Sequence, residues 1–286
     1  MNKPNVILDS DVCNEADDLF AIAYLLKSNM FNVKAITIAP FKHSMWKGTV
    51  AESIDASYKE ACKLYDYLGI HDYTTIVKGS RDYFKNGYEE ETDAIKRMFE
   101  IIKECDKTYI LAIGCLTNIA ILLKHHPEVI NKIELIWLGS NFLFGDNQDF
   151  NFKQDVDAVG YVFSSKVNMT VIPCSPITSN LLMSIYELKY ELKSGNALND
   201  YLIDKFYDRP WGPHRRWPLW DISVVAYMIN KKWFKTINIC APEIGEDNKF
   251  IFVKSDHEIT FVRGLNANLI LDNMFEVLKK DNVEWY

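Results

Sequence analysis

The stretch NVILDSDVCNEADDLFAIAYLLKS, residues 5–28, places an apolar run, a cluster of acidic side chains and a second apolar segment in direct succession. The run NVIL has the Val, Ile and Leu content of a strand that is buried on both faces, as in a parallel sheet. The segment LFAIAYLLKS has the periodicity of a helix. The stretch therefore predicts a strand, a loop rich in carboxylates, and a helix.

The same alternation continues along the chain. Further runs of the strand type occupy residues 33–40, 74–79, 108–114, 133–139 and 168–173, and helical patterns lie between them at residues 49–69, 92–105 and 116–132. Strands and helices that alternate at this spacing predict an α/β fold with a doubly wound, mainly parallel sheet flanked by helices. We find no Pro/Gly/Ser-rich linker and no internal repeat, so we expect residues 1–286 to form a single domain.

Net charge, the length of the first apolar run and the cysteine spacing indicate which partners and which cellular location to expect. The net charge of −7 argues against a nucleic acid polymer as a partner, because binding phosphates requires an excess of Lys and Arg on one face. The first apolar run is too short for a signal-peptide core or a membrane span. The six cysteines show no CxxC spacing and are typical of reduced thiols. We therefore expect a cytoplasmic protein that binds neither nucleic acid nor membrane.

Ligands of open parallel sheets bind beyond the carboxyl ends of the strands. In residues 7–18 that position holds five carboxylates: Asp9, Asp11, Glu15, Asp17 and Asp18. Two carboxylates about 4 Å apart repel each other by roughly 4 kcal/mol near a protein surface, so such a cluster favours a bound cation. Oxygen ligands of this kind suit calcium or magnesium, and the Cys/His set of a zinc site is missing.

Two other interpretations of these carboxylates remain open. Asp17 and Asp18 precede a helical pattern and are favoured residue types for capping or for a first helical turn. Asp9 and Asp11 occupy alternate strand positions, so their side chains point the same way. Their DxD spacing also occurs in phosphatases, which predicts a different chemistry for the same residues.

Four segments together resemble the motifs of the inosine-uridine nucleoside hydrolase family. DSDVCNEADDLFAIAYLL is similar to DxDxxxDDAxAxxLA, and IGCLTNIAILLKHHPEVINKI to TGGLTNIAxAxxxxPxIxxxI. DFNFKQDVDAVGYVF is similar to EFNxxxDPEAAxxVF, and WDISVVAYMI to HDPxAVAYxI. The resemblance implies an enzyme, an N-ribohydrolase that uses calcium to hydrolyse the N-glycosidic bond of a ribonucleoside. It also implies a small-molecule nucleoside or N-riboside as substrate and a homodimer or homotetramer.

Carried over residue by residue, the resemblance implies a calcium site. Its ligands are Asp11, Asp18, Asp221 and the backbone carbonyl of Ile113. Asp9 is expected to orient Asp11, as groups behind a metal ligand commonly do. From the sequence alone, Asp221 is equally explained as the N-cap of the helical pattern that follows it.

The resemblance also implies how the substrate is held. Asp11 is expected to take a proton from the attacking water. Asp17, Asn151 and Asp221 are expected to contact the ribose hydroxyls, and Asp149 the 5′ hydroxyl. Asp149 stands where the family has a glutamate and is one methylene shorter. Asn118 in GCLTN is interpreted as a turn or helix-cap residue and not as a ligand of the substrate.

The chain departs from the family pattern in three places. The first loop is two residues longer and adds Asn14 and Glu15, to which no role is assigned. Trp220 stands where the family has a histidine proposed to protonate the leaving base, and an indole cannot donate a proton at neutral pH. Trp220 either stacks on the base or packs in the core. The candidates for the missing acid are His214, His43 and Lys42.

The third departure combines Lys42 and His43 with residues 209–220, which carry Trp211, Arg215 and Arg216 among others. As a lid this segment would offer aromatic stacking and positive charge, which predicts a ligand with an anionic group or a modified base. The loss of the histidine also keeps a second function open. The chain is then a metal-containing nucleoside- or ribose-binding protein with little or no turnover.

Overall fold

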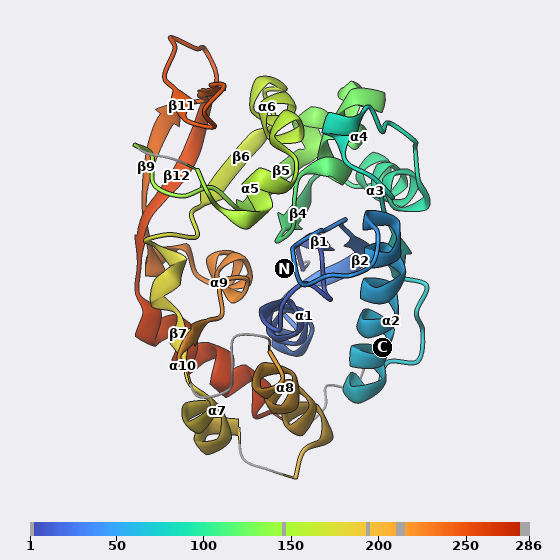
Figure 1. The fold of residues 1–286 in the computed structure, drawn as a ribbon, viewed down its shortest axis with the longest axis vertical. Coiled ribbons are helices and arrows are strands. Elements are labelled where there is room, and N and C mark those ends of the chain that lie inside the picture. The colour runs from blue at the N-terminus through green and yellow to red at the C-terminus, as the bar shows by residue number, and fades with distance from the viewer. Residues whose placement is uncertain (1–2, 145–146, 193–194, 210–214, 281–286) are drawn as a thin grey trace.

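The computed structural model describes residues 3–144, 147–192, 195–209 and 215–280. The strands of the main sheet are β1 (Asn5–Ser10), β2 (Asn32–Ile38), β3 (Ile76–Lys78), β4 (Thr108–Ala112), β5 (Ile133–Leu138), β6 (Asn168–Ile172), β9 (Phe234–Cys240) and β12 (Glu258–Leu265). Their spatial order is β3-β2-β1-β4-β5-β6-β12-β9 (Figure 1). Neighbours run parallel except β9, which pairs antiparallel with β12. The prediction of a mainly parallel α/β sheet is confirmed.

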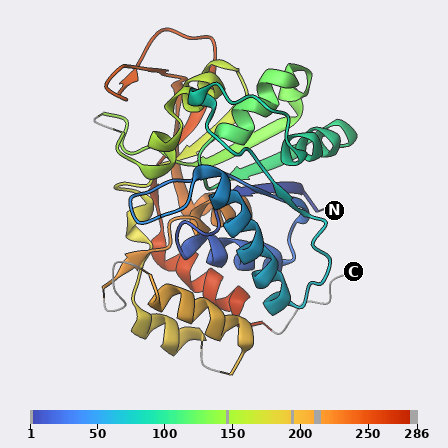
Figure 2. The same cartoon turned by 45° about the vertical axis from the view of Figure 1, so that its right-hand side comes forward.

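The helices cover both faces of this sheet. They are α1 (Asp17–Ser28), α2 (Val50–Leu68), α3 (Asp93–Glu104), α4 (Thr117–His125), α5 (Phe150–Gln154), α6 (Val156–Ser164), α7 (Ile185–Leu192), α8 (Ala197–Tyr207), α9 (Ile222–Ile229) and α10 (Ala267–Leu278). One core packs α1, α2 and α7 to α10 against the sheet, and a second packs α3, α4 and α6 against the other face. Figure 2 shows the red helix α10 and the ochre helices α7 and α8 on the side of α1.

The side chains of β1 point alternately into the two cores. Val6 and Leu8 belong to the core around α1, whereas Ile7 belongs to the core around α3 and α4. Successive side chains of a strand point to opposite faces, so a strand that is apolar at every position requires helices on both sides. The continuous apolar run NVIL therefore fixes β1 in the interior of the sheet.

Two features of the fold differ from the sequence prediction. The helical pattern at residues 116–132 is divided, because α4 ends at His125 and Pro127 starts a 3-10 helix, Pro127–Lys132. Proline has no N–H to continue the helical hydrogen bonds. The antiparallel edge formed by β9 and β12 was not predicted. Whether residues 1–286 form one domain stays a prediction.

Two small antiparallel sheets lie outside the main one. β7 (Leu182–Met183) pairs with β8 (Trp217–Pro218), and β10 (Glu243–Ile244) pairs with β11 (Phe250–Ile251). The first of these pairs places Trp217 near the carboxyl ends of the parallel strands, as the next section describes. In the part of the chain that the structure describes, no helix is both long and apolar enough to cross a membrane.

Candidate active site

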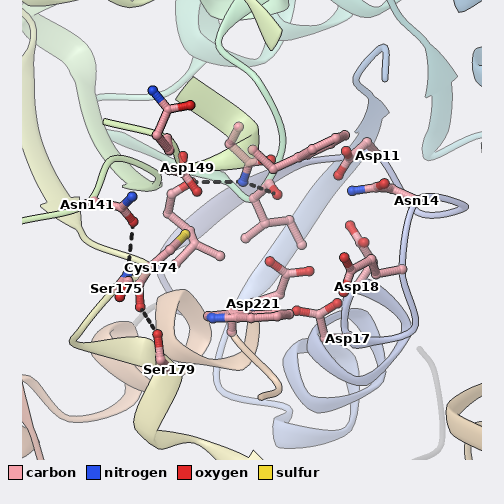
Figure 3. A pocket seen from close by; sticks show the side chains of 17 residues that line it. Asp11, Asn14, Asp17, Asp18, Asn141, Asp149, Cys174, Ser175, Ser179 and Asp221 are labelled. Carbon is pink, nitrogen blue, oxygen red and sulfur yellow. Dashed lines mark hydrogen bonds between the residues drawn. The ribbon is translucent and has the colours of Figure 1, made fainter. Parts of the chain in front are cut away.

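A cavity of about 250 Å³ opens at the carboxyl ends of the parallel strands (Figure 3). Its walls come from the loop after β1, from the residues that follow β4, β5 and β6, and from the start of α9. The described lining residues are Asp11, Asn14, Glu15, Asp17, Asp18, Ile113, Leu138, Asn141, Gln148, Asp149, Phe150, Asn151, Cys174, Ser175, Ser179, Trp220 and Asp221. Every metal, catalytic and ribose-binding residue predicted from the sequence, except Asp9 behind them, therefore lines one cavity.

Three buried carboxylates converge on this cavity from two helices. α1 and α9 lie side by side, and each begins at the cavity (Figure 1). One carboxylate oxygen from each of Asp17, Asp18 and Asp221 lies within 4.8 Å of the others. Ser10 Oγ donates a hydrogen bond to Asp18 Oδ1 at 2.5 Å. The structure thus brings the predicted ligands Asp18 and Asp221 together, with Asp17 as the third member of the group.

Helix capping does not explain these carboxylates. The N-cap of α1 is Ala16, and no side-chain capping hydrogen bond is present there. Asp221 occupies the N-cap position of α9, yet its side chain makes no capping bond either. Asp17 Oδ2 instead accepts a 3.4 Å hydrogen bond from the Asp221 N–H. Asp221 is thus at the N-cap position without acting as a cap, whereas Asp17 and Asp18 do lie in the first turn of α1, where acidic residues are favoured.

Asp11 and Asp9 each keep one buried oxygen without a partner. Among the described residues, none forms a hydrogen bond with Asp11 Oδ2 or Asp9 Oδ2. Asp9 lies behind the cavity wall, where Thr37 Oγ1 and Asn118 Nδ2 both donate to its Oδ1. A buried acceptor without a donor is costly. Such an oxygen is explained at a site that receives a ligand.

Burial and mutual repulsion raise the pKa values of the acidic cluster. Burial raises the pKa of Asp11, Asp17 and Asp221 well above the ordinary value, and the neighbouring carboxylates raise them further. Burial raises the pKa of Asp18 to about 7. For Asp9, burial raises the pKa to about 6 although its two hydrogen-bond donors oppose the shift. Among the described lining residues there is no Lys, Arg or His to offset this negative charge.

The donor set fits a hard divalent cation. All candidate ligand atoms are oxygens, as calcium requires, and calcium accepts carboxylates together with backbone carbonyls. The unpartnered oxygen of Asp11 and the uncompensated charge of Asp18 and Asp221 are both satisfied by a cation at this position. Ile113, whose backbone carbonyl accepts a hydrogen bond from Asn151 Nδ2, lines the same cavity. The calcium ion itself stays a prediction.

Asn151 is fixed by its amide nitrogen. Its Nδ2 donates to the backbone carbonyls of Ile113 at 2.9 Å and Leu138 at 3.0 Å. These bonds join the ends of β4 and β5 and use both N–H groups. The Oδ1 atom is therefore the one that Asn151 offers to a ligand, and an oxygen acceptor is what a ribose hydroxyl needs.

Asp149 is held at the start of α5. Its Oδ2 accepts hydrogen bonds from the N–H groups of Ser140 at 2.9 Å and Phe152 at 2.8 Å. The side chain faces Cys174 across the cavity wall (Figure 3). Burial raises the pKa of the Cys174 thiol well above its ordinary value, and the Asp149 carboxylate raises it further, so the thiol stays protonated. Contact between Asp149 and a 5′ hydroxyl stays a prediction.

Trp220 lines the cavity and also contacts the core. Its ring lies edge to face with Trp217, with centroids 5.4 Å apart. Trp217 Nε1 donates to Glu15 Oε2 at 2.9 Å. Burial raises the pKa of Glu15, whereas this hydrogen bond lowers it. Trp220 therefore packs against the core and also lines the cavity, and its stacking on a base stays a prediction.

The three candidate acids lie in different places. Lys42 Nζ donates to the backbone carbonyls of Trp46 and Gly48 and is absent from the described lining of the cavity. His43 lines a second, adjoining cavity and stacks on Phe41. His214 lies outside the described residues. Of the three, His43 is the candidate that the structure places beside a cavity.

Two of the basic side chains predicted to bind an anion, Lys42 and Arg216, interact with other groups of the protein. Arg216 forms an ion pair with Glu187 on the surface, and Lys42 is used within its own loop. Arg215 offers its backbone carbonyl to Arg209. The described residues thus give no support to an anion site made of Lys42, Arg215 and Arg216. Trp211 and the rest of residues 210–214 lie outside the described residues.

The structure corrects the interpretation of Asn118 as a turn or helix-cap residue. It is buried inside α4, and its Oδ1 accepts hydrogen bonds from the N–H and the hydroxyl of Ser80 at 2.9 and 2.8 Å. Its Nδ2 donates to Asp9 and to the Ile38 carbonyl. The residue connects β1, β2 and the segment after β3 and is absent from the described lining of the cavity.

Sequence reasoning missed part of the cavity wall. Asn141, Gln148, Phe150, Cys174 and Glu15 line the cavity but received no role. Each lies in a segment that follows a parallel strand, which is the signal that points to them. Their contribution depends on how the loops after β5 and β6 fold, and no residue pattern in those loops encodes that path.

Comparisons with known proteins agree with the resemblance. The family model described as inosine-uridine preferring nucleoside hydrolase matches residues 6–265. A non-specific ribonucleoside hydrolase of Salmonella paratyphi A is 29% identical over 294 residues, covering 94% of this chain and 93% of that protein. A probable ribonucleoside hydrolase of Dictyostelium discoideum is 25% identical over 264 residues, covering 77% and 76%.

A solved structure extends the agreement to the fold. The purine-preferring ribonucleoside hydrolase from Gardnerella vaginalis superposes with a TM-score of 0.75 and 20% sequence identity, covering 96% of this chain and 98% of that chain. The match over residues 6–265 includes the loop after β1, the carboxyl ends of the parallel strands and α9. The chain therefore belongs to the inosine-uridine preferring nucleoside hydrolase family, whose members are enzymes of the N-ribohydrolase class.

Proposed function

We propose that the protein hydrolyses the N-glycosidic bond of a ribonucleoside, with calcium bound in the cavity, and releases the free base and ribose. The observation that carries the proposal is the group of buried carboxylates Asp17, Asp18 and Asp221, set beside the unpartnered oxygen of Asp11. Such an arrangement costs stability unless it serves a cation or a cationic transition state. Hydrolysis of a riboside provides the latter, because C1′ develops oxocarbenium character.

The proposed ligands of calcium are Asp11, Asp18, Asp221 and the Ile113 carbonyl. Asp18 and Asp221 have the strongest support, since they belong both to the predicted set and to the group within 4.8 Å. A bound calcium ion would bind the vicinal ribose hydroxyls and acidify water, as divalent cations do in hydrolytic sites.

The side chains of this protein then carry the remaining steps. A carboxylate oxygen of Asp11 that does not bind calcium accepts the proton of the attacking water, because Asp11 is a buried carboxylate that lines the cavity. Asp17 and Asn151 Oδ1 accept hydrogen bonds from the ribose hydroxyls. Phe150, which lines both cavities, provides an apolar wall for the base, and Trp220 provides an apolar wall of the first cavity. The negative charge of the cavity stabilises the positive charge that develops on the sugar.

The test is release of free base and reducing sugar from inosine and uridine. We expect turnover with calcium chloride and loss of turnover after chelation with EGTA. Asp11→Asn should lower kcat by at least about 10²-fold, the contribution typical of a general base. Asp157→Asn is the matched control, because Asp157 is an exposed aspartate in α6. Turnover that persists in Asp11→Asn or in EGTA contradicts the proposal.

The alternative function, nucleoside binding with little or no turnover, is motivated by Trp220. Among the described residues that line the first cavity, no histidine stands ready to protonate the leaving base. Calorimetry with inosine in the presence of calcium separates the two functions. Saturable heat of binding without any release of base supports the alternative.

Membership of the family also leads us to propose a homodimer or homotetramer and a cytoplasmic location. Light scattering on the purified chain measures the first, since a monomer has a mass of 33.2 kDa. Fractionation of the native cells measures the second.

A further inference from the structure

A second cavity of about 470 Å³ adjoins the first. The two share a wall made of Asn14, Glu15, Asp17 and Phe150. A ligand whose sugar contacts Asp17 in the first cavity therefore lies beside residues that also line the second. The inference below rests on the proposed function, because it concerns the group that leaves the sugar.

Asn14 and Glu15 stand at this junction with unused hydrogen-bonding capacity. Trp217 Nε1 donates to Glu15 Oε2 at 2.9 Å and fixes the carboxylate. No described residue donates to the other oxygen, Oε1, and none forms a hydrogen bond with the Asn14 side-chain amide. Figure 3 shows Asn14 beside Asp11 and Asp18, across the cavity from Asn141 and Cys174. Two polar groups are thus available where the two cavities meet.

Lys205 and the terminal nitrogens of Arg209 are engaged at the second cavity, whereas Arg209 Nε is buried without a hydrogen-bond partner among the described residues. Lys205 forms an ion pair with Glu60. The terminal nitrogens of Arg209 donate to the backbone carbonyls of Phe206 and Arg215. Burial and the Lys42 charge lower the pKa of His43, so its ring is neutral at pH 7. The cavity therefore favours a neutral leaving group that donates hydrogen bonds over an anionic one.

The second cavity also has aromatic walls. Trp46, Phe150 and Trp217 line it, and Phe150 faces both cavities. Flat heteroaromatic rings gain from stacking against such side chains. A planar ring that is polar along one edge satisfies the walls and the Asn14–Glu15 pair at once.

We propose that Asn14 and Glu15 select the leaving group, with Glu15 Oε1 accepting a hydrogen bond from an N–H group on the edge of a heteroaromatic base in the second cavity. The Asn14 amide binds the neighbouring atom of the same edge. Leaving groups with an N–H donor on that edge are favoured, because a base without one leaves a charged acceptor desolvated and unpaired.

The experiment compares adenosine with purine riboside, which differs by the loss of one amino group. Glu15→Gln is the informative variant, because the Gln carbonyl still accepts from Trp217 Nε1 while its amide nitrogen replaces the free acceptor. We measure kcat/KM for both nucleosides at pH 8 with calcium, in the wild type and the variant. The ratio of adenosine to purine riboside should fall by about tenfold in Glu15→Gln, the factor expected for one hydrogen bond to a charged group.

Controls separate recognition from folding. Glu104→Gln makes the same chemical change at an exposed position in α3 and should leave the ratio as in the wild type. Asn14→Ala removes a side chain without protein partners among the described residues and should also lower the ratio. It keeps the proposal testable if thermal unfolding shows that Glu15→Gln is misfolded. An unchanged ratio in a folded Glu15→Gln or Asn14→Ala variant overturns the inference.

Failure of the proposed function is a different outcome. If the wild type hydrolyses neither nucleoside, the hydrolase proposal fails, and dissociation constants for the two compounds are measured by calorimetry instead. Their ratio must then fall by the same factor in Glu15→Gln. Equal binding of adenosine and purine riboside by the wild type, or an unchanged ratio of dissociation constants, overturns the recognition role.

Discussion

Asn118 Nδ2 donates a hydrogen bond to Asp9 Oδ1 at 2.9 Å, deep behind the acidic cluster. The same nitrogen donates to the Ile38 carbonyl at 3.0 Å, and Asn118 Oδ1 accepts from both the N–H and the hydroxyl of Ser80. Thr37 Oγ1 donates to the same oxygen of Asp9. One fully buried amide thus holds β1, β2 and the segment after β3 in register beneath the site.

This relationship predicts the effect of Asn118→Ala. The substitution leaves the Ser80 N–H and the Ile38 carbonyl with one partner fewer in a fully buried location. We expect the free energy of unfolding to fall by about 1–3 kcal/mol, the cost of unsatisfied buried polar groups. Urea denaturation measures it. Asn131→Ala, at an exposed position, is the control and should change stability by less than about 0.5 kcal/mol. Equal effects of the two substitutions contradict the role of Asn118.

The raised pKa values of the acidic cluster predict how stability depends on pH without metal. A carboxylate whose pKa is higher in the folded protein binds more protons when folded than when unfolded, so stability falls as pH rises. Burial raises the pKa of Asp18 to about 7 and that of Asp9 to about 6, both above the ordinary value of an aspartate. In EGTA, stability should therefore decrease between pH 4 and pH 7.

Calcium should reverse this dependence, because it binds the ionised carboxylates and favours the folded state. Thermal melts at pH 5 and pH 8, each with EGTA or calcium, measure the effect. We expect calcium to raise Tm more at pH 8 than at pH 5. In Asp18→Asn this stabilisation should be largely lost, whereas Asp157→Asn should keep it. A calcium effect that is the same at both pH values counts against a site formed by these carboxylates.

The sequence predicted the six parallel strands β1 to β6, including β3 at one edge of the sheet, and missed the C-terminal strands β12 and β9 at the other end. The runs that form β1, β2, β4, β5 and β6 are rich in Val, Ile, Leu and other apolar residues and are mostly buried, because these strands are covered on both faces. β9 alternates exposed and partly buried residues at the edge of the sheet, so its run FKTINIC carries a much weaker signal. Its antiparallel pairing with β12 brings together residues far apart in the sequence.

The roles of Asp11, Ile113, Asn151 and Asp221 came from the family resemblance and stay predictions. The structure shows that these residues line one cavity, because the segments that carry them meet at one edge of the sheet. The hydrogen bond between Glu15 and Trp217 could not be predicted from the sequence, because the two residues are 202 positions apart. That hydrogen bond depends on the pairing of β7 with β8, and these strands are too short to show a pattern of alternating apolar residues.

Asp149 provides a test of how the 5′ end of the sugar is held. In Asp149→Asn the amide oxygen still accepts from the N–H groups of Ser140 and Phe152, so the start of α5 is preserved. If the carboxylate binds the 5′ hydroxyl, kcat/KM should fall by about tenfold for inosine and hardly change for 5′-deoxyinosine. Steady-state kinetics with both substrates measure the difference. A loss of the same size for both indicates that Asp149 only positions the loop.

His43 is the candidate acid whose location permits direct contact with a leaving base. Its Nδ1 accepts a 3.2 Å hydrogen bond from the Met45 N–H, so the proton of the neutral ring is on Nε2. The ring lies 6.3 Å from that of Phe150, which faces both cavities. His43→Gln should therefore lower kcat for inosine by about 10²-fold, the contribution typical of general acid catalysis.

A substrate that needs no acid distinguishes this role from a structural one. 4-Nitrophenyl riboside releases a stable phenolate, so His43→Gln should hydrolyse it at nearly the wild-type rate. If His43 serves only to stack on Phe41, both substrates should lose activity together, because the wall of the second cavity then shifts for either of them. If neither substrate is affected, the proton comes from another group. His125→Gln, at the exposed last residue of α4, is the control and should leave both rates unchanged.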